Sequence, residues 1–173
     1  MKRLGLVILI VSLGLSVLWL KKEKSLMQLT SVFSDNQAIP SQFTCDGGNI
    51  NPELNITGIP TETKSLSIIV DDPDAPGGDF VHWVLWNLGP ETVQIKENTA
   101  PAGATVGKND FGNNNYGGPC PPSDIHRYQF KVYALDAKLD LPASAGKKEL
   151  LAAMNGHILN QAMLVGNYGR IKI

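Results

Sequence analysis

Most side chains that could do chemistry lie in two polar clusters, and the first is Asp71-Asp72-Pro73-Asp74-Ala75-Pro76. A residue before proline is held in an extended conformation, so Asp72 should end a strand with its carboxylate direction fixed. His82 follows ten residues later, inside an apolar run. The acidic cluster also fits a simple polar turn. A histidine in an apolar run either forms hydrogen bonds within the core or faces a cavity near Trp83 or Trp86.

The second cluster is the segment Tyr116-Gly117-Gly118-Pro119-Cys120-Pro121-Pro122, followed closely by His126-Arg127-Tyr128. Consecutive glycines let the backbone approach a ligand closely and leave N–H groups that can bind an anion. The prolines stiffen the segment. A rigid loop that leads into a strand beginning with histidine is typical of a binding-site wall, and an ordinary loop between strands has the same composition.

Other catalytic patterns do not occur in the sequence. It contains neither the G-x-S-x-G pattern of a nucleophilic serine nor the G-x-x-x-x-G-K-[ST] phosphate loop. The aspartates of the first cluster and His82 lack the spacing of recognised metal ligands. We therefore predict no metal and no cofactor, and we expect a binding protein rather than an enzyme.

Short strands must position these clusters, because β-branched and aromatic residues or strict alternation of apolar and polar residues mark several short runs. The strands are expected at residues 65–70, 80–88, 126–135 and within 160–173, and one helix at 147–155, ended by Gly156. Strands do not alternate with helices, which predicts an all-β antiparallel sandwich with peripheral helix. The long segment 96–116, rich in Gly and Asn, is typical of a functional or mobile connection.

The N-terminus differs from the rest of the chain. Residues 4–20 carry no charge, and lysines and arginine flank this run on both sides. As a helix it would be about 26 Å long, just enough to span a bilayer. We therefore expect a signal anchor or a cleaved signal peptide at 1–24 and a domain at 25–173. The domain should be membrane-anchored or secreted, on the periplasmic or extracellular side.

The amino-acid composition limits the classes of partner that the protein can bind. The 173 residues have a formal net charge of -1, and residues 25–173 alone carry -5, which argues against a nucleic-acid partner. Cys45 and Cys120 are too few for a four-cysteine zinc site. In an exported domain they can pair, whereas in the cytosol they would stay free thiols, and the sequence leaves both states open. A disulfide between them would stabilise the fold by about 4.5 kcal/mol through chain entropy.

Taken in chain order, these motifs resemble the phosphatidylethanolamine-binding protein family, which includes the Raf kinase inhibitor-like proteins of bacteria. The resemblance spans about residues 29–173. It rests on the segments Phe43–Gly47, Asp71–Pro76, Val81–Leu85, Gly107–Gly112, Tyr116–Pro122, His126–Tyr128 and Ala153–His157.

The resemblance implies an antiparallel β-sandwich with a few peripheral helices and one small pocket for anions such as a phosphoethanolamine headgroup. His82 and His126 would donate hydrogen bonds to phosphate oxygens, Gly118 would offer its N–H, and Asp72 would orient a histidine. Together, the pocket positions implied are Asp72, Ala75, Pro76, His82, Gly118, His126 and Tyr128.

Three functions follow as hypotheses. The first is a non-enzymatic protein that binds a small anionic or phosphorylated ligand and contacts the membrane through its N-terminal helix. The second is an inhibitor of a protease or kinase, regulated by the pocket, with an unknown protein partner. The third is a hydrolase that uses Asp72 and the histidines as acid and base.

Overall fold

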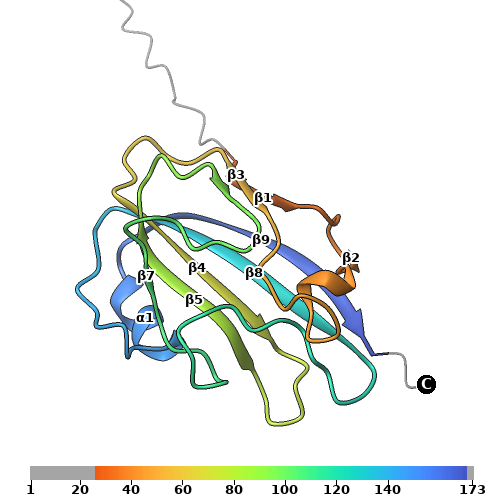
Figure 1. Ribbon diagram of the computed structural model, residues 1–173. Coiled ribbons are helices and arrows are strands. Elements are labelled where there is room, and N and C mark those ends of the chain that lie inside the picture. The colour runs from red at the N-terminus through yellow and green to blue at the C-terminus, as the bar shows by residue number, and fades with distance from the viewer. Residues whose placement is uncertain (1–25, 171–173) are drawn as a thin grey trace, which may run out of the picture.

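The computed structural model describes residues 26–170 and folds them into two β-sheets (Figure 1). The larger sheet has six strands and the smaller has three. The large sheet runs, in spatial order, β2 (Gln37–Ala38), β9 (Ile158–Gly169), β8 (Ile125–Leu135), β4 (Ser65–Asp72), β5 (Phe80–Leu88) and β7 (Thr105–Val106). The small sheet runs β1 (Gln28–Ser31), β3 (Leu54–Thr57) and β6 (Gln94–Ile95). The helices are η1 (Ser41–Phe43), a single 3₁₀ turn, and α1 (Lys147–Met154).

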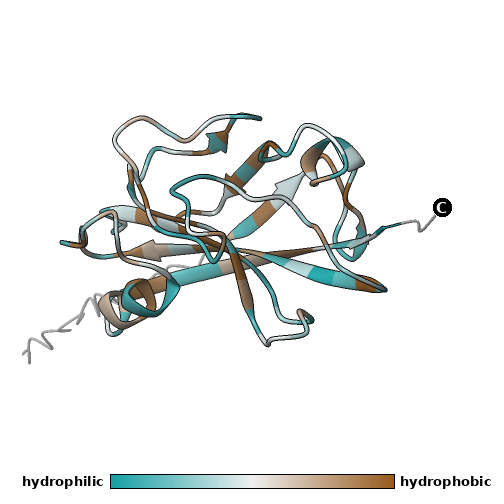
Figure 2. Cartoon of the chain, turned by 60° about the horizontal axis from the view of Figure 1, so that its bottom comes forward, coloured by the Kyte–Doolittle hydropathy of each residue, from teal (hydrophilic) through white to brown (hydrophobic). Residues whose placement is uncertain are grey.

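The large sheet is covered on both faces. The small sheet packs over one face, and residues of both sheets form the main core, among them Leu54, Ile68 and Phe130. Helix α1 covers part of the opposite face, where Leu150 and Met154 pack in a second core (Figure 2). Burial on both faces explains why every residue of β4 is buried and why Leu66 and the run Ile68–Val70 are apolar.

The predicted elements largely coincide with the structure, with two corrections. The strand predicted at 80–88 matches β5, and the helix ends one residue earlier than predicted, before Asn155. The sheets are not antiparallel throughout, because β2 pairs with β9 in parallel. Among the described residues there is one α-helix and one 3₁₀ turn, rather than a few peripheral helices.

A β-bulge in β5 changes the direction of its side chains. Val70 pairs with Trp83 and the next residue of β4, Asp71, pairs with Val81, so His82 is an extra residue on β5. Such bulges bend a strand and re-aim a side chain. The His82 ring consequently meets the ring of Tyr128, with the ring centroids 5.2 Å apart.

Adjacent aspartates at the end of β4 serve opposite faces of the sheet. Asp71 is fully buried and accepts hydrogen bonds from Lys131 and from Lys147, the first residue of α1. Lys147 also binds Asp79. This ion network fastens α1 to the sheet, because a buried carboxylate needs such partners. Asp72, the next residue of β4, takes no part in this network and lies on the opposite face of the sheet.

The predicted signal anchor at 1–24 lies outside the described residues. Within 26–170, no helix is long and apolar enough to cross a membrane.

Candidate functional site

Four of the predicted ligand residues meet at one end of the large sheet. Asp72 ends β4, His126 and Tyr128 lie near the start of β8, and His82 lies near the start of β5. Antiparallel pairing of these three neighbouring strands brings the four together. Each side chain is almost fully buried: the exposed fractions are 3% for Asp72 and His82, 5% for His126 and 0% for Tyr128. A ligand at this site must therefore be small.

The Asp72 carboxylate is held in a fixed direction, as its position before Pro73 predicts. Its Oδ1 accepts a hydrogen bond from the Asp74 N–H at 2.8 Å, and its Oδ2 lies 2.7 Å from Nδ1 of His126. The carboxylate therefore orients the His126 ring and directs Nε2 away from Asp72.

An ion pair between Asp74 and Arg127 at the protein surface links the first polar cluster to the start of β8. The Asp74 carboxylate accepts hydrogen bonds from the Arg127 guanidinium at 2.6 and 2.8 Å and from its backbone N–H at 3.0 Å. These bonds lower the pKa of Asp74 to about 2. The pair is largely solvent-exposed, so it adds little to the free energy of unfolding. Its role is to position the two segments relative to each other.

His82 is fixed through its other ring nitrogen. Nδ1 lies 2.6 Å from the carbonyl oxygen of Gly117. Because a carbonyl can only accept, Nδ1 carries the proton and Nε2 is the nitrogen left to meet a ligand. Burial lowers the pKa of His82, although the Gly117 carbonyl and the Asp72 charge oppose this effect. In its neutral form, His82 thus offers an acceptor at Nε2.

Tyr128 lies between the two histidines and has an unsatisfied hydroxyl. Its ring is perpendicular to His82 and roughly parallel to His126, with centroids 5.2 and 6.5 Å apart. Its buried hydroxyl forms no hydrogen bond of normal geometry within residues 26–170. Burial, together with the nearby Asp72 charge, raises the pKa of this hydroxyl. Tyr128 is therefore neutral, and its hydroxyl lies near the Asp72 carboxylate without forming a hydrogen bond of normal geometry.

Gly118 requires a correction to its predicted role. Its N–H donates to Oδ1 of Asn49 at 2.7 Å, so it does not offer this group to an anion in the structure. The lack of a side chain matters instead for packing. A Cβ at this position would lie 2.6 Å from the Phe43 carbonyl oxygen and 2.8 Å from Asn49 Oδ1. Gly118 thus lets the second cluster pack against the 43–49 loop.

This packing gives a testable stability difference. Gly118→Ala is expected to destabilise the fold by about 1–3 kcal/mol, because backbone atoms must move to admit the methyl group. Gly77→Ala is the matched control, since no atom lies within 4 Å of a Cβ there. Urea denaturation of both variants checks the difference, and equal stabilities would contradict this role of Gly118.

The predicted wall residues lie in the turn between β4 and β5. Ala75 is half-buried and its carbonyl accepts the Gly78 N–H, whereas Pro76 is exposed. An exposed proline contributes less to a buried pocket than the resemblance implies.

The contacts that three residues make beside the site were not predicted from the sequence. Phe111 packs edge-on against His82, with centroids 5.4 Å apart, and remains 45% exposed. Asn49 and the Gly117 carbonyl hold the Gly-Pro segment and His82. An isolated aromatic residue in a loop rich in Gly and Asn is a weak signal for Phe111, and no local pattern marks Asn49.

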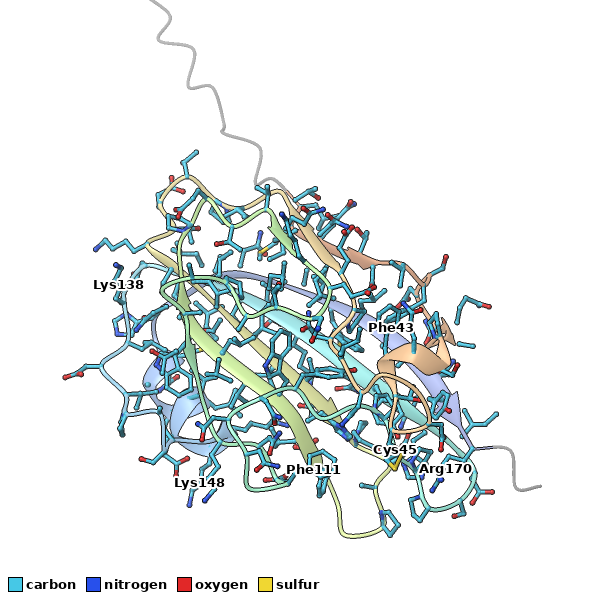
Figure 3. The ribbon with its side chains drawn as sticks, in the orientation of Figure 1. Phe43, Cys45, Phe111, Lys138, Lys148 and Arg170 are labelled. Atoms are coloured by element: carbon cyan, nitrogen blue, oxygen red, sulfur yellow. A yellow bond between two sulfur atoms is a disulfide. The ribbon has the colours of Figure 1, made fainter. Side chains whose placement is uncertain are left out.

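A disulfide joins Cys45 to Cys120 beside the site (Figure 3). Cys45 and Phe111 lie at the same end of the molecule in this view. A cavity of about 160 Å³ adjoins the disulfide and is lined by Gly117, Gly118 and Phe111 among others. Within residues 26–170, no group of three or more His, Cys, Asp or Glu side chains is arranged to hold a metal ion.

Comparison with known proteins decides the family. Residues 29–169 match the family model described as phosphatidylethanolamine-binding protein. The chain belongs to the phosphatidylethanolamine-binding protein family. Two solved members of this family resemble it in structure. A putative family homologue from Chlamydia trachomatis is 41% identical, with a TM-score of 0.81, and the match covers 85% of this chain and 99% of that one.

The second solved family member is YbcL from E. coli, 30% identical, with a TM-score of 0.78 over 84% of this chain and 99% of that one. A relative from Methanothermobacter thermautotrophicus, called a UPF0098 protein, is 49% identical over 82% of this chain and 97% of its own length. Another from Pyrococcus horikoshii is 46% identical over 93% of this chain and 85% of its own. The chain thus has similar relatives in both archaea and bacteria.

Proposed function

We propose that this chain is a non-enzymatic binding protein whose site at Asp72, His82, His126 and Tyr128 takes one small phosphate-bearing or other anionic group. The observation that carries the proposal is the Tyr128 hydroxyl, a buried donor beside Asp72 that forms no hydrogen bond of normal geometry. An unpaired buried hydroxyl costs free energy that a ligand oxygen would recover. The Nε2 atoms of the two histidines beside it point away from their own partners, so a phosphate group that reached all three side chains would gain three contacts.

The charges of the site determine which protonation state binds. His82 is neutral at pH 7, because burial lowers the pKa of its ring below the ordinary value. A neutral His82 accepts at Nε2, so the site favours a phosphate that still carries a proton. An anion without a proton requires protonated His82, which donates from both nitrogens. Affinity for such an anion should therefore rise as the pH falls below about 6.5.

The variant Tyr128→Phe should weaken ligand binding without destabilising the fold. The hydroxyl forms no hydrogen bond of normal geometry in the described structure, so its removal should change stability little. Phosphate affinity should fall by about 10–150-fold, as expected for one hydrogen bond to a charged group. Calorimetric titration with inorganic phosphate measures both proteins. Unchanged affinity in Tyr128→Phe would remove the main support for the proposed site.

The disulfide supports export of the domain. Structural disulfides persist in oxidising compartments and are rare in the cytosol of mesophiles. We therefore propose that residues 25–173 act on the periplasmic or extracellular side, anchored or released by the segment 1–24. Fractionation of cells that produce the full chain tests this location, and recovery from the cytosol with free thiols would contradict it.

A further inference from the structure

The disulfide between Cys45 and Cys120 is open to reagents in solution (Figure 3). Cys120 is exposed and Cys45 is half-buried, and both cysteines line the cavity of about 160 Å³ beside the candidate site. Buried structural disulfides resist reduction, whereas exposed disulfides are the ones that exchange with thiols. The position of this disulfide therefore allows its reduction in the folded protein.

Cys120 ends a segment that contacts the candidate site through its backbone. We call Gly117–Cys120 the cysteine segment. Gly117 donates its N–H to the His82 carbonyl at 3.0 Å, and its own carbonyl lies 2.6 Å from Nδ1 of His82. The Cys120 backbone lies beside the Tyr128 hydroxyl and opposes the rise in its pKa that burial causes. The position of the cysteine segment therefore fixes the orientation of His82 and the surroundings of Tyr128.

The cysteine segment is attached at three successive residues to the loop that carries Cys45 and Asn49. The Gly118 N–H donates to Oδ1 of Asn49 at 2.7 Å. The Pro119 carbonyl accepts the Cys45 N–H at 3.0 Å, and Cys120 forms the disulfide. Each hydrogen bond can open and re-form by itself, whereas the covalent bond cannot. The disulfide therefore keeps the segment in place when a hydrogen bond opens.

We propose that reduction of this disulfide weakens ligand binding at the candidate site, so that the oxidised protein holds the ligand and the reduced protein releases it. This inference rests on the proposed function, since it concerns the regulation of that same site. Without the covalent link, hydrogen bonds alone hold the cysteine segment, and Nδ1 of His82 loses its fixed acceptor. The ligand must then order the site itself, which lowers its affinity.

The reductant is a dithiol, which supplies the two electrons. One of its thiolates attacks Sγ of Cys120, the more exposed cysteine, and the mixed disulfide forms as Cys45 leaves as a thiolate. The second thiolate of the reductant attacks its own sulfur in the mixed disulfide and releases Cys120. The two cysteine thiolates take up the two protons that the reductant has lost, and the reductant ends as a disulfide.

Thermodynamic linkage makes the effect measurable in both directions. If the oxidised chain binds phosphate tenfold more tightly than the reduced chain, saturating phosphate must oppose reduction by the same factor. For a two-electron couple, a factor of ten lowers the midpoint potential of the disulfide by about 30 mV.

The test compares the oxidised full chain with the chain reduced by dithiothreitol, an uncharged dithiol. Calorimetric titration with inorganic phosphate should show binding about tenfold weaker after reduction. In buffers of dithiothreitol and its oxidised form, saturating phosphate should lower the midpoint potential by about 30 mV. Equal affinity of the two forms, or an unshifted midpoint, overturns the inference alone. An oxidised chain that binds no phosphate overturns the proposed function with it.

A folding control accompanies the titration of the reduced chain. The indole NMR signals of Trp83 and Trp86, both buried in the oxidised structure, show whether the reduced chain is folded. Where it is not, the titrations are made in sucrose, an uncharged osmolyte that favours the folded state.

The variant Asn49→Gly tests the position of the cysteine segment with the disulfide intact. It removes the acceptor of the Gly118 N–H, and glycine fits the positive φ of 52° at this position. Phosphate affinity should fall about fivefold, as expected for one hydrogen bond. Asn36→Gly is the matched control, an exposed asparagine with a φ of 59° whose amide donates to Asp35, and it should bind like the wild type. Unchanged affinity in Asn49→Gly would overturn the link between the segment and the site.

Discussion

Replacing His82 with asparagine is expected to abolish saturable phosphate binding while the fold is retained. Asparagine places an amide N–H near the position of Nδ1, so the hydrogen bond to the Gly117 carbonyl can persist. Nε2 and the titratable charge are lost. Because His82 is 3% exposed, its replacement removes a contact in a site closed to bulk water, where charge-assisted hydrogen bonds are strongest. Calorimetry with phosphate should show at least a hundredfold weaker binding, equivalent to roughly 3 kcal/mol.

The same variant should change how stability depends on pH. The pKa of His82 in the folded protein lies below its ordinary value of about 6.5. As the pH falls below about 6.5, the unfolded chain takes up a proton that the folded chain does not, so the free energy of unfolding decreases. His82→Asn removes this contribution, and its stability should fall less steeply with acid. Identical pH profiles together with intact phosphate binding would contradict a buried, ligand-contacting His82.

Removing the disulfide is expected to have the largest effect on stability. Cys45 and Cys120 are 75 residues apart, and closing such a loop in the unfolded chain corresponds to about 4.5 kcal/mol. The double variant Cys45→Ser, Cys120→Ser should therefore lose about that free energy of unfolding. Its melting temperature should fall by roughly 10 °C or more.

Hydrogen bonds beside the disulfide explain why the site should loosen as well. The Cys45 N–H donates to the Pro119 carbonyl at 3.0 Å, and the Tyr116 hydroxyl donates to the Phe43 carbonyl at 3.1 Å. These bonds hold the segment that carries the Gly117 carbonyl against the 43–49 loop. Denaturation of the wild type with and without reductant gives the measurement, and the serine variant should not respond to reductant. A loss below about 1 kcal/mol would show that the disulfide constrains little of the unfolded chain.

The long strands were predictable because their patterns are local. β5 and β8 carry nine and eleven residues, with enough apolar and alternating positions to define them. β2, β6 and β7 have two residues each, which is too short for any periodicity. Their pairing depends on partners far away in the sequence, so the small sheet and the parallel pair were not foreseen.

The candidate site, like the fold, could be predicted from the sequence only in part. The fixed carboxylate of Asp72 follows from the proline after it, and the structure bears this out with a hydrogen bond from the Asp74 N–H. The bulge that directs His82 toward Tyr128 depends on the register between β4 and β5, which no single strand reveals. Likewise, the N–H of Gly118 is taken by Asn49, a residue 69 positions away. Local sequence therefore indicates which residues carry the chemistry, and tertiary pairing decides which of their groups remain available.

The most direct test of the anion site is nitrogen NMR of the full chain with isotope-labelled histidine, titrated with inorganic phosphate. The chain has only three histidines. His82 and His126 lie in the proposed site, whereas His157 is exposed and pairs with Asp136, which makes it an internal control. We expect saturable shifts of the Nε2 signals of His82 and His126 at one common affinity, and none for His157. No saturable shift of either site histidine, or equal shifts of all three, would contradict it.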